Sequence, residues 1–398
     1  MSSISRLNQL DYLTPPVAGR IQQRSLWIGI IFGIAAVIGA FVSPGQFFPS
    51  FLIGYMLWIG VSLGCLAFLM LTHLTGGGWA MVIRRIFEAG SRTLWMMVVL
   101  FIPIIIGMHR LYVWTNPAEV AKDEHLQHIT KIYLSTPYFL MRAALAFIAW
   151  GLLVYFLQKW SDIQDSPPDR DLGLRFRNIS GPGLVVYGLT MTFAAVDWVM
   201  SIEPNWTSTI YSLIFVVGQA MTGIAIATIA VVILAKYEPM KTILQPDNLK
   251  DYGNLMLTWV MVWAYFSFSQ WLIIWAGNVP DEISWYVKRL QEGWNYVGFT
   301  LMIFQFAVPF ALLLSRSFKK NPRKISLLAG WLLVMQWLGL VWMVEPSFHK
   351  SFYLSWQDVV IPIAIGGFWF WLFFRNLQQR PLIPLHDPKA HAILGTED

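Results

Sequence analysis

The sequence predicts an all-helical integral membrane protein with about ten transmembrane helices, and three observations support this fold class. Of the 398 residues, 56% are apolar and only 13% are charged, whereas a soluble domain carries roughly 25% charged residues. The mean hydropathy is positive, at +0.55. Apolar stretches of about 20 residues, the length that a helix needs to cross a bilayer, recur along most of the chain.

The predicted elements follow the apolar stretches, each of which ends where polar or basic residues begin. An N-terminal segment, 1–25, precedes the first stretch, the transmembrane domain covers 26–375, and 376–398 form a C-terminal tail. The predicted spans are, in chain order, 26–42, 47–71, 93–114, 138–160, 181–202, 208–235, 254–277, 294–315, 325–344 and 356–374. A weak internal sequence similarity relates the end of the fifth span to the end of the ninth. It suggests two four-helix bundles, formed by helices 2–5 and 6–9, with helices 1 and 10 at the periphery.

The distribution of basic residues predicts the topology. The chain has 28 Lys and Arg against 22 Asp and Glu, and placing alternate loops on opposite sides puts 21 of the cations on one side and five on the other. Cytoplasmic loops are enriched in Lys and Arg, so both termini are predicted to be cytoplasmic. The same enrichment explains the basic balance, and we expect membrane lipids and no nucleic acid among the partners.

Two further features are predicted to lie at the membrane surface. The segment 76–88, Gly-Gly-Gly-Trp-Ala-Met-Val-Ile-Arg-Arg-Ile-Phe-Glu, is expected to form an amphipathic helix on the cytoplasmic interface. Most of the tryptophans are expected to form an interfacial aromatic belt, because they stand near predicted span ends. Examples are Trp79, Trp114, Trp160, Trp206, Trp294 and Trp356.

The composition argues against several cofactor sites within this chain. Cys65 is the single cysteine, so no internal disulfide and no cysteine-ligated zinc or iron–sulfur site is expected. Only His109 is predicted to lie clearly inside the membrane, and a haem held by two histidines needs a second one at matching depth. The first 25 residues contain no apolar core followed by a cleavage site, so no cleavable signal peptide is expected. We therefore expect no cofactor bound by this chain, although a quinone could bind.

Four ionisable side chains are predicted to form a layer in the outer half of the membrane. His109 and Arg110 lie roughly 6 to 8 Å below the outer end of the third span, Arg142 lies at a similar depth in the fourth, and Asp197 lies roughly 8 Å below the end of the fifth. Buried charges in a membrane need partners. Asp197 is thus expected to face His109, Arg110 or Arg142, either as a structural ion pair, as a proton acceptor at a quinol-sized pocket, or as part of a substrate or ion pathway.

Two Glu-Pro pairs mark predicted outer boundaries. Glu203 follows the fifth span and Glu345 follows the ninth, and each could be hydrated, cap the next helix or connect a proton pathway to the outer water. No carboxylate is expected in the inner half of any span. The nearest ones, Glu88, Asp162 and Asp251, are placed at the cytoplasmic edge.

The segment "DWVMSIEPNWTSTIY" at 197–211, the segment "GGGWAMVIRR" and the ten predicted helices resemble a known family. They are similar to the smaller of the two NrfD-like (polysulfide-reductase-type) membrane subunits of bacterial alternative complex III, the ActF family. The resemblance implies a subunit of a quinol:cytochrome c oxidoreductase in the bacterial inner membrane, in a respiratory or photosynthetic electron transport chain.

The resemblance also implies partners and a site. The partners would be a larger NrfD-like sister subunit, an iron–sulfur subunit, multihaem and monohaem cytochrome c subunits that carry haem c, and small anchoring helices. In the broader family a His and an Asp line a quinol pocket in the outer half of one bundle, and His109 and Asp197 match them in type and depth. The alternatives are a stand-alone secondary transporter and a purely structural membrane anchor.

Overall fold

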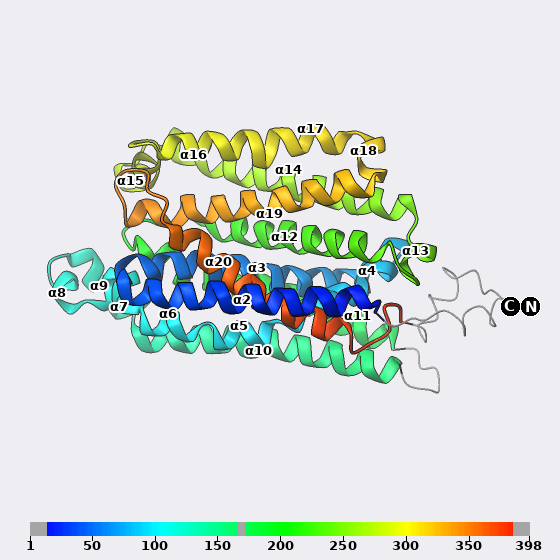
Figure 1. The fold of residues 1–398 in the computed structure, drawn as a ribbon. Helices are drawn as coiled ribbons and strands as arrows, with labels where there is room; N and C mark the ends of the chain where they lie inside the picture. The colour runs from blue at the N-terminus through cyan, green and yellow to red at the C-terminus, as the bar shows by residue number, and fades with distance from the viewer. Residues whose placement is uncertain (1–13, 166–171, 385–398) are drawn as a thin grey trace, which may run out of the picture.

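The chain folds into a bundle of long helices that run side by side (Figure 1). The computed structural model describes residues 14–165 and 172–384, and within these residues it contains helices and irregular segments but no strand. Residues 1–13 and 385–398, most of the N-terminal segment and of the C-terminal tail, lie outside the described residues. The described residues therefore confirm the prediction that the protein is all-helical, and the spanning segments below support its membrane character.

Ten helical segments of the described residues are long and apolar enough to cross a membrane, as predicted. Most of them extend beyond the predicted apolar stretch, because polar turns continue the helix, whereas the sixth and eighth stay within it. The segments are α2 (Pro16–Val42), α3 (Pro44–Thr75), α4 to α6 (Gly78–Ile106), α10 (Thr136–Gln164), α11 with a 3₁₀ end (Gly173–Ile202), α12 (Tyr211–Leu234), α14 (Pro246–Gly277), α16 to α17 (Trp294–Leu314), α19 with a 3₁₀ end (Pro322–Ser347) and α20 (Trp356–Leu377).

Two of these segments are interrupted. The third consists of α4 (Gly78–Ser91), α5 (Leu94–Val99) and α6 (Ile102–Ile106), and the eighth carries a π-helical stretch, Met302–Ala307, between α16 (Trp294–Leu301) and α17 (Val308–Leu314). The remaining helices are short and lie in the connections. They are α7 (Met108–Leu111), α8 (Pro117–Val120), α9 (Glu124–Ile132), α13 (Met240–Ile243), α15 (Pro280–Arg289) and α18 (Arg316–Lys320).

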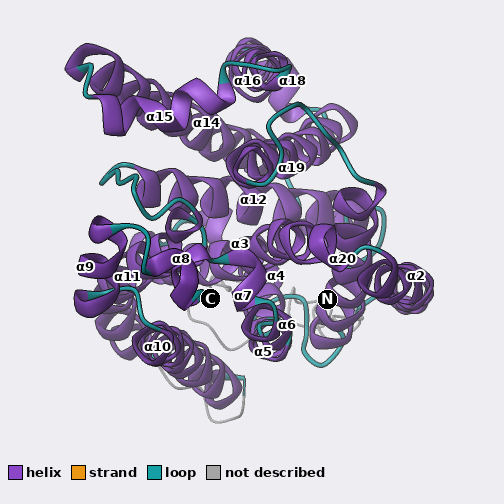
Figure 2. Cartoon of the chain, turned by 90° about the vertical axis from the view of Figure 1, so that its left-hand side faces the viewer, coloured by secondary structure: helices purple, strands orange, loops and turns teal. Residues whose placement is uncertain are grey.

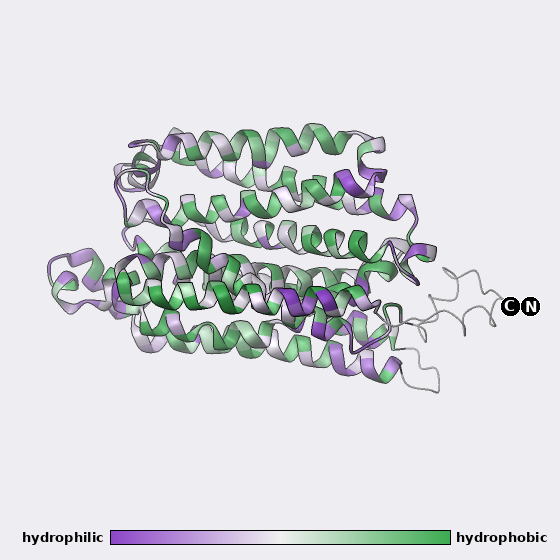
Figure 3. Cartoon of the chain, in the orientation of Figure 1, coloured by the Kyte–Doolittle hydropathy of each residue, from purple (hydrophilic) through white to green (hydrophobic). Residues whose placement is uncertain are grey.

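The short helices distinguish the two ends of the bundle. Helices α7, α8, α9 and α15 lie at one end, on the left of Figure 1, and α13, α18 and the start of α4 lie at the other. Hydrophilic residues are concentrated toward both ends, while the middle of most helices is apolar (Figure 3). Following the predicted topology, we call the first end the outer end and the second the inner end.

Helices α3 and α12 form the centre of the bundle, and both are buried along most of their length. They approach closely because both carry glycine at the contact: a Cβ added at Gly64 would lie 2.0 Å from the Gln219 carbonyl oxygen. A Cβ at Gly223 would lie 2.7 Å from the Gly64 carbonyl carbon. Small residues permit this kind of helix packing in membranes, where no hydrophobic effect drives helices together.

The other helices surround this centre (Figure 2). Helix α2 packs along α20, with Gly29 of α2 against the backbone of Gly367. Helix α3 also contacts α4, α11 and α20, and α12 also contacts α14 and α19. The outward faces of α2, α14 and the eighth segment carry many exposed large apolar side chains, as lipid contact requires.

The amphipathic helix predicted at 76–88 is present as α4, but its predicted position on the membrane interface is wrong. Helix α4 is buried from Ala80 to Ser91 and is the first part of the third segment, which begins about 15 residues before the predicted 93. Its charged side chains can be buried because they neutralise one another. Glu88 contacts Arg84 at 3.3 Å, Arg85 at 2.7 Å and Arg380 at 3.0 Å.

The position of Glu88 corrects a second expectation. It lies inside the third segment and is 3% exposed, rather than at a hydrated cytoplasmic edge. Its Oε1 also accepts a hydrogen bond of 3.0 Å from Ser161 of α10. The cluster around Glu88 therefore ties α4, α10 and the segment after α20 together at the inner end.

The prediction that most tryptophans form an interfacial aromatic belt is wrong in part. Trp114, Trp206 and Trp294 are at most 4% exposed, whereas Trp356 is 49% exposed. The buried ones lie under the connections of the outer end: Trp206 stacks on Trp285 of α15, with ring centroids 4.8 Å apart. Folding of these connections over the helix ends converts predicted interfacial residues into core residues.

Candidate functional site

Asp197 and Arg142 form a buried ion pair between α11 and α10. Arg142 donates from Nε to Asp197 Oδ2 at 2.7 Å and from Nη2 to Oδ1 at 2.9 Å. Asp197 is 1% exposed, and the Arg142 side chain is 17% exposed. Of the three partners expected for Asp197, the structure therefore selects Arg142.

The pair continues toward the surface through Tyr133, which lies between α9 and α10. The guanidinium of Arg142 stands over the Tyr133 ring, 3.9 Å from its centroid, and its Nη2 donates to the Tyr133 carbonyl oxygen at 3.2 Å. Burial, and then the negative charge of Asp197, raise the pKa of the Tyr133 hydroxyl well above its usual range. Tyr133 thus stays neutral and covers the ion pair.

His109 and Arg110 do not join this pair. Both are exposed on α7, beyond Ile106, where the third segment ends. Within the described residues no hydrogen bond or ion pair connects either of them to Asp197. Their predicted depth was wrong because the third segment covers Gly78–Ile106 instead of the predicted 93–114. Both residues therefore follow the end of the segment.

Two buried donors of α3 and α11 lack a hydrogen-bond partner in the described part of the chain. They are the Tyr55 hydroxyl of α3 and Nε1 of Trp198, the residue after Asp197. Both side chains are fully buried, and their ring centroids lie 6.1 Å apart. A buried polar group without a partner is costly, so these donors mark a place where a polar ligand group would be stabilised.

Glu203 lies at the outer end in a cluster of opposite charge. Its Oε2 accepts from Lys288 Nζ at 2.7 Å, and its Oε1 accepts from Arg289 Nη1 at 3.1 Å and from Ser347 Oγ at 2.7 Å. Burial alone would raise the pKa of Glu203. The charge of Arg289 and the hydrogen bonds from Lys288 and Ser347 outweigh burial and lower it, so Glu203 is an ionised structural carboxylate.

Arg289 of α15 joins the two Glu-Pro segments. It is fully buried, and its Nη2 donates to the Met343 carbonyl oxygen at 2.7 Å and its Nε to that of Trp342 at 3.2 Å. Burial lowers the pKa of Arg289, although Glu203 partly offsets this effect. The contact between the ends of α11 and α19 is therefore made by a cation that sequence reasoning placed in a loop.

Glu345 belongs to a second cluster, which is dominated by carboxyl groups. Gln46 Nε2 donates to Glu345 Oε1 at 3.0 Å and to Asp358 Oδ1 at 3.3 Å. Both carboxyl side chains are fully buried, and both accept from the same Gln46 amide. Two adjacent buried carboxyl groups disfavour a second negative charge, because like charges repel and burial penalises the charged form.

The carboxyl pair is connected to the outer surface on one side and to the core on the other. His349 Nδ1 lies 2.9 Å from Glu345 Oε2, and the His349 side chain is 34% exposed. Ser50 of α3 donates to Asp358 Oδ1 at 2.5 Å. Burial lowers the pKa of His349 despite the nearby charge of Asp358, so the imidazole is neutral at pH 7 and can accept a proton.

Sequence reasoning identified Glu345 and missed its partners Asp358, Gln46 and His349. The sequence did not single out Asp358, because an acidic residue at that position is also typical of a helix start. Together with Ser355 it forms a capping box at the start of α20, in which its Oδ2 accepts from the Ser355 backbone N–H at 2.7 Å. Gln46 precedes Glu345 by 299 residues, so no local pattern could have revealed the contact.

The middle of the bundle contains neutral polar contacts. The Tyr187 hydroxyl of α11 donates to Gln219 Oε1 of α12 at 2.5 Å, and the side-chain amides of Gln305 and Gln336 lie 3.3 Å apart. Gln305 stands within the π-helical stretch of the eighth segment. These are hydrogen bonds between neighbouring helices.

The described residues contain no group of three or more His, Cys, Asp and Glu that could hold a metal ion. No family model matches this chain, and no curated protein matches it.

Proposed function

We propose that this chain is a membrane subunit of a bacterial quinol:cytochrome c oxidoreductase and that it handles protons at its outer end. The single observation that carries the proton-handling part is the carboxyl pair of Glu345 and Asp358. Both carboxyl groups are fully buried and accept from Gln46, and Glu345 lies 2.9 Å from a neutral, partly exposed imidazole; the proposal is that the two carboxyl groups hold one proton between them. Membership in the oxidoreductase is supported by the resemblance of residues 197–211 and 76–85 to the smaller NrfD-like subunit.

The proposed proton route has three positions. A proton on the carboxyl pair passes from Glu345 Oε2 to His349 Nδ1 and leaves from the exposed part of that ring. Gln46 donates to both carboxyl groups and so fixes their relative position. Quinol oxidation releases protons, and a shared carboxyl proton next to a histidine can receive and pass them near neutral pH.

A quinone site in this chain would use the first bundle. Tyr55 and Trp198 carry buried donors that have no partner in the described part of the chain, and their rings contact each other. Trp198 follows Asp197 of the ion pair with Arg142, and a quinone oxygen can accept hydrogen bonds from such donors. Haem c and iron–sulfur clusters would be carried by the partner subunits, which also include the larger sister subunit.

The proposal includes the finer architecture of the family. Helix α3 contacts α4 and α11, and α10 contacts α11, which supports a first bundle. Helix α12 contacts α14 and α19, and α14 contacts α17, which supports a second bundle, with α2 and α20 paired beside them. The charge distribution supports cytoplasmic termini and a location in the bacterial inner membrane.

The stand-alone transporter receives less support. Transporters built from repeats carry broken helices at matching positions of the two halves. Here the interruptions fall in the third and eighth segments, whereas a repeat of four helices would pair the third with the seventh. The structural anchor remains the alternative for Asp197, whose bidentate ion pair joins two helices without any ligand.

The test is purification of the native protein in mild detergent, followed by a visible spectrum and quinol:cytochrome c activity. We expect c-type haem to co-purify. Glu345→Gln and Asp358→Asn are each expected to lower turnover by about tenfold or more with unchanged haem content, because each removes a carboxyl from the shared pair. Glu119→Gln, which changes an exposed outer carboxylate paired with Lys122, is the matched control and should keep full turnover.

Two outcomes would contradict the proposal separately. A single chain that purifies without haem rules out the oxidoreductase. Wild-type turnover in intact complexes of both carboxyl variants rules out the proton role and leaves the cluster as a structural feature.

A further inference from the structure

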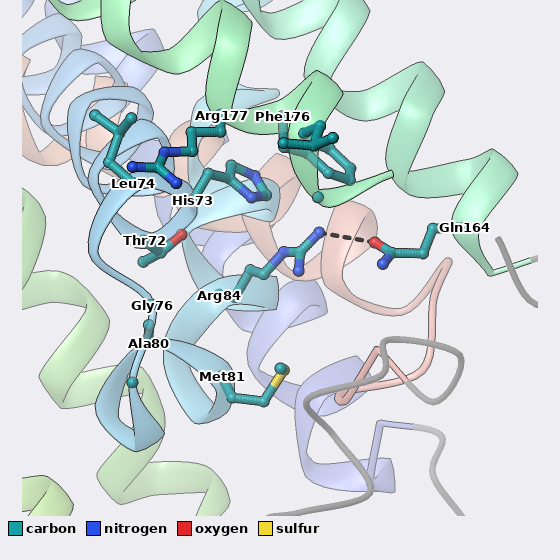
Figure 4. A pocket seen from close by; sticks show the side chains of 13 residues that line it. Thr72, His73, Leu74, Gly76, Ala80, Met81, Arg84, Gln164, Phe176 and Arg177 are labelled. Atoms are coloured by element: carbon teal, nitrogen blue, oxygen red, sulfur yellow. Dashed lines mark hydrogen bonds between the residues drawn. The ribbon is translucent and has the colours of Figure 1, made fainter. Parts of the chain in front are cut away.

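A cavity of about 310 Å³ lies at the inner end, far from the carboxyl pair, between the end of α3, the start of α4 and the start of α11. Its size is at the lower end of the range of ligand pockets. Figure 4 shows the side chains of His73, Arg84 and Arg177 grouped around this space, with Gln164 bonded to Arg84. The proposed proton route leaves this cavity without a role.

The lining of the cavity favours an anion. None of the described residues that line it is acidic, whereas Arg177 is cationic, as is Arg84, whose Nε also contacts Glu88. Arg84 is 5% exposed and is held by Gln164 at 3.1 Å. Arg177 is exposed and brings a second guanidinium to the same space. Guanidinium groups suit phosphate oxygens because their N–H donors form a planar fork.

The start of α4 adds backbone donors to the same cavity. Gly76 and Gly77, which line it, have φ values of 63° and 91°, and no side chain caps the helix at Gly77. The first N–H groups of a helix have no partner within the helix and carry partial positive charge. Here that charge and Arg177 lie at the same partly open cavity.

The side chains on this wall are held in place by Phe176. The His73 ring stacks on the Phe176 ring, with centroids 4.2 Å apart and an interplanar angle of 5°. The Arg84 guanidinium stands 5.0 Å from the centroid of the same ring. The positions of both groups are therefore set before a ligand arrives.

Apolar residues at the cavity point to a lipid as the source of the phosphate. Leu74, Met81 and Leu174 also line it, and Leu174 is 72% exposed. The cavity stands where α3 ends, at Thr75, which places it at the level of lipid headgroups if α3 crosses the membrane. Basic pockets between transmembrane helices on this side suit anionic headgroups.

From these contacts we infer that the cavity binds the phosphate of an anionic phospholipid, with Arg177 and the start of α4 contacting the phosphate oxygens. Free inorganic phosphate offers the same oxygens but does not use the apolar residues, and an experiment can separate the two sources.

The test uses the delipidated full-length protein in its native complex and measures binding of short-chain dioctanoyl phosphatidylglycerol, dioctanoyl phosphatidylcholine and inorganic phosphate by microscale thermophoresis. We expect phosphatidylglycerol to bind about tenfold more tightly than phosphatidylcholine, and Arg177→Gln to weaken phosphatidylglycerol binding by about tenfold. Arg175→Gln is the matched control. It removes an exposed arginine two residues away that does not line the cavity, and it should change affinity by less than about twofold.

The outcomes decide between the sources. If inorganic phosphate displaces phosphatidylglycerol only at concentrations far above that of the lipid, the lipid is the ligand of the cavity. Equal affinity for inorganic phosphate and phosphatidylglycerol overturns the lipid assignment, because the apolar wall would then contribute nothing. Equal effects of Arg177→Gln and Arg175→Gln, or equal affinity for the two lipids, overturn the site itself. Thermal melting of both variants checks that each is folded.

Discussion

At the scale of single residues, the chain places charge inside a membrane bundle in two ways. Asp197 and Glu203 are neutralised by arginines from other elements, Arg142 and Arg289. Glu345 and Asp358 instead lie together and both accept from Gln46. The first arrangement is stable without further chemistry, whereas the second is the one proposed to hold a transferable proton. This difference separates structural carboxylates from the proposed functional ones.

The Asp197–Arg142 pair leads to a stability prediction. Asp197→Asn leaves the Arg142 guanidinium without a counter-ion, and the loss is reduced because Arg142 is partly exposed. We expect a destabilisation of about 2 to 3 kcal/mol. Arg142→Gln should cost a similar amount, and the double variant should cost less than the sum. Melting of the four proteins in detergent measures this coupling, and additive effects would show that the pair contributes no interaction of its own.

Glu203 leads to a prediction about pH. Its pKa in the folded protein is lowered from the ordinary value of 4.5, so its ionisation stabilises the fold. That contribution is fully present above about pH 5 and is lost as the pH falls through the lowered pKa. The difference in melting temperature between wild type and Glu203→Gln should be constant from pH 7 to pH 5 and then shrink toward lower pH. A difference that grows on acidification would show the opposite sign of the shift.

At the scale of elements, the contact between α3 and α12 sets the centre of the bundle. We expect Gly64→Ala to destabilise the protein by about 2 to 3 kcal/mol, because its Cβ would meet the Gln219 backbone at 2.0 Å. Gly330→Ala is the control: it is also a helical glycine, but nothing lies within 4 Å of an added Cβ. It should be neutral or stabilise by up to about 1 kcal/mol. Detergent melting curves of both variants compare them, and equal melting temperatures would mean that the helices separate without cost.

The connections at the outer end act as structural elements in their own right. Helix α15 supplies Arg289 and Trp285, which contact the segments that follow α11 and α19. The connection before α20 supplies His349. The clusters around Glu203 and Glu345 therefore depend on how these connections fold over the helix ends, and hydropathy carries no information about this.

At the scale of the whole molecule, the even number of spans places the start of α2 and the end of α20 at the same end of the bundle. The charge distribution predicts that this end is cytoplasmic. Lys131→Cys, at the outer end, should react with a membrane-impermeant maleimide on intact spheroplasts. Lys241→Cys, at the inner end, should react only after permeabilisation. The single native Cys65 is buried and should remain unlabelled, and the reverse pattern would invert the topology.

The sequence by itself determined that this is a helical membrane protein with ten spans, because each span needs about 20 apolar residues and such stretches are local features of the chain. It also identified Asp197, Glu203 and Glu345 as unusual. Only the tertiary structure decided which charges meet. Arg142 rather than His109 pairs with Asp197, Arg289 pairs with Glu203, and Gln46 brings Asp358 together with Glu345. The third segment was misplaced for the same reason. The charges of α4 look hydrated in sequence, yet they are buried because Asp165 after α10 pairs with Arg85 and Arg380 after α20 pairs with Glu88.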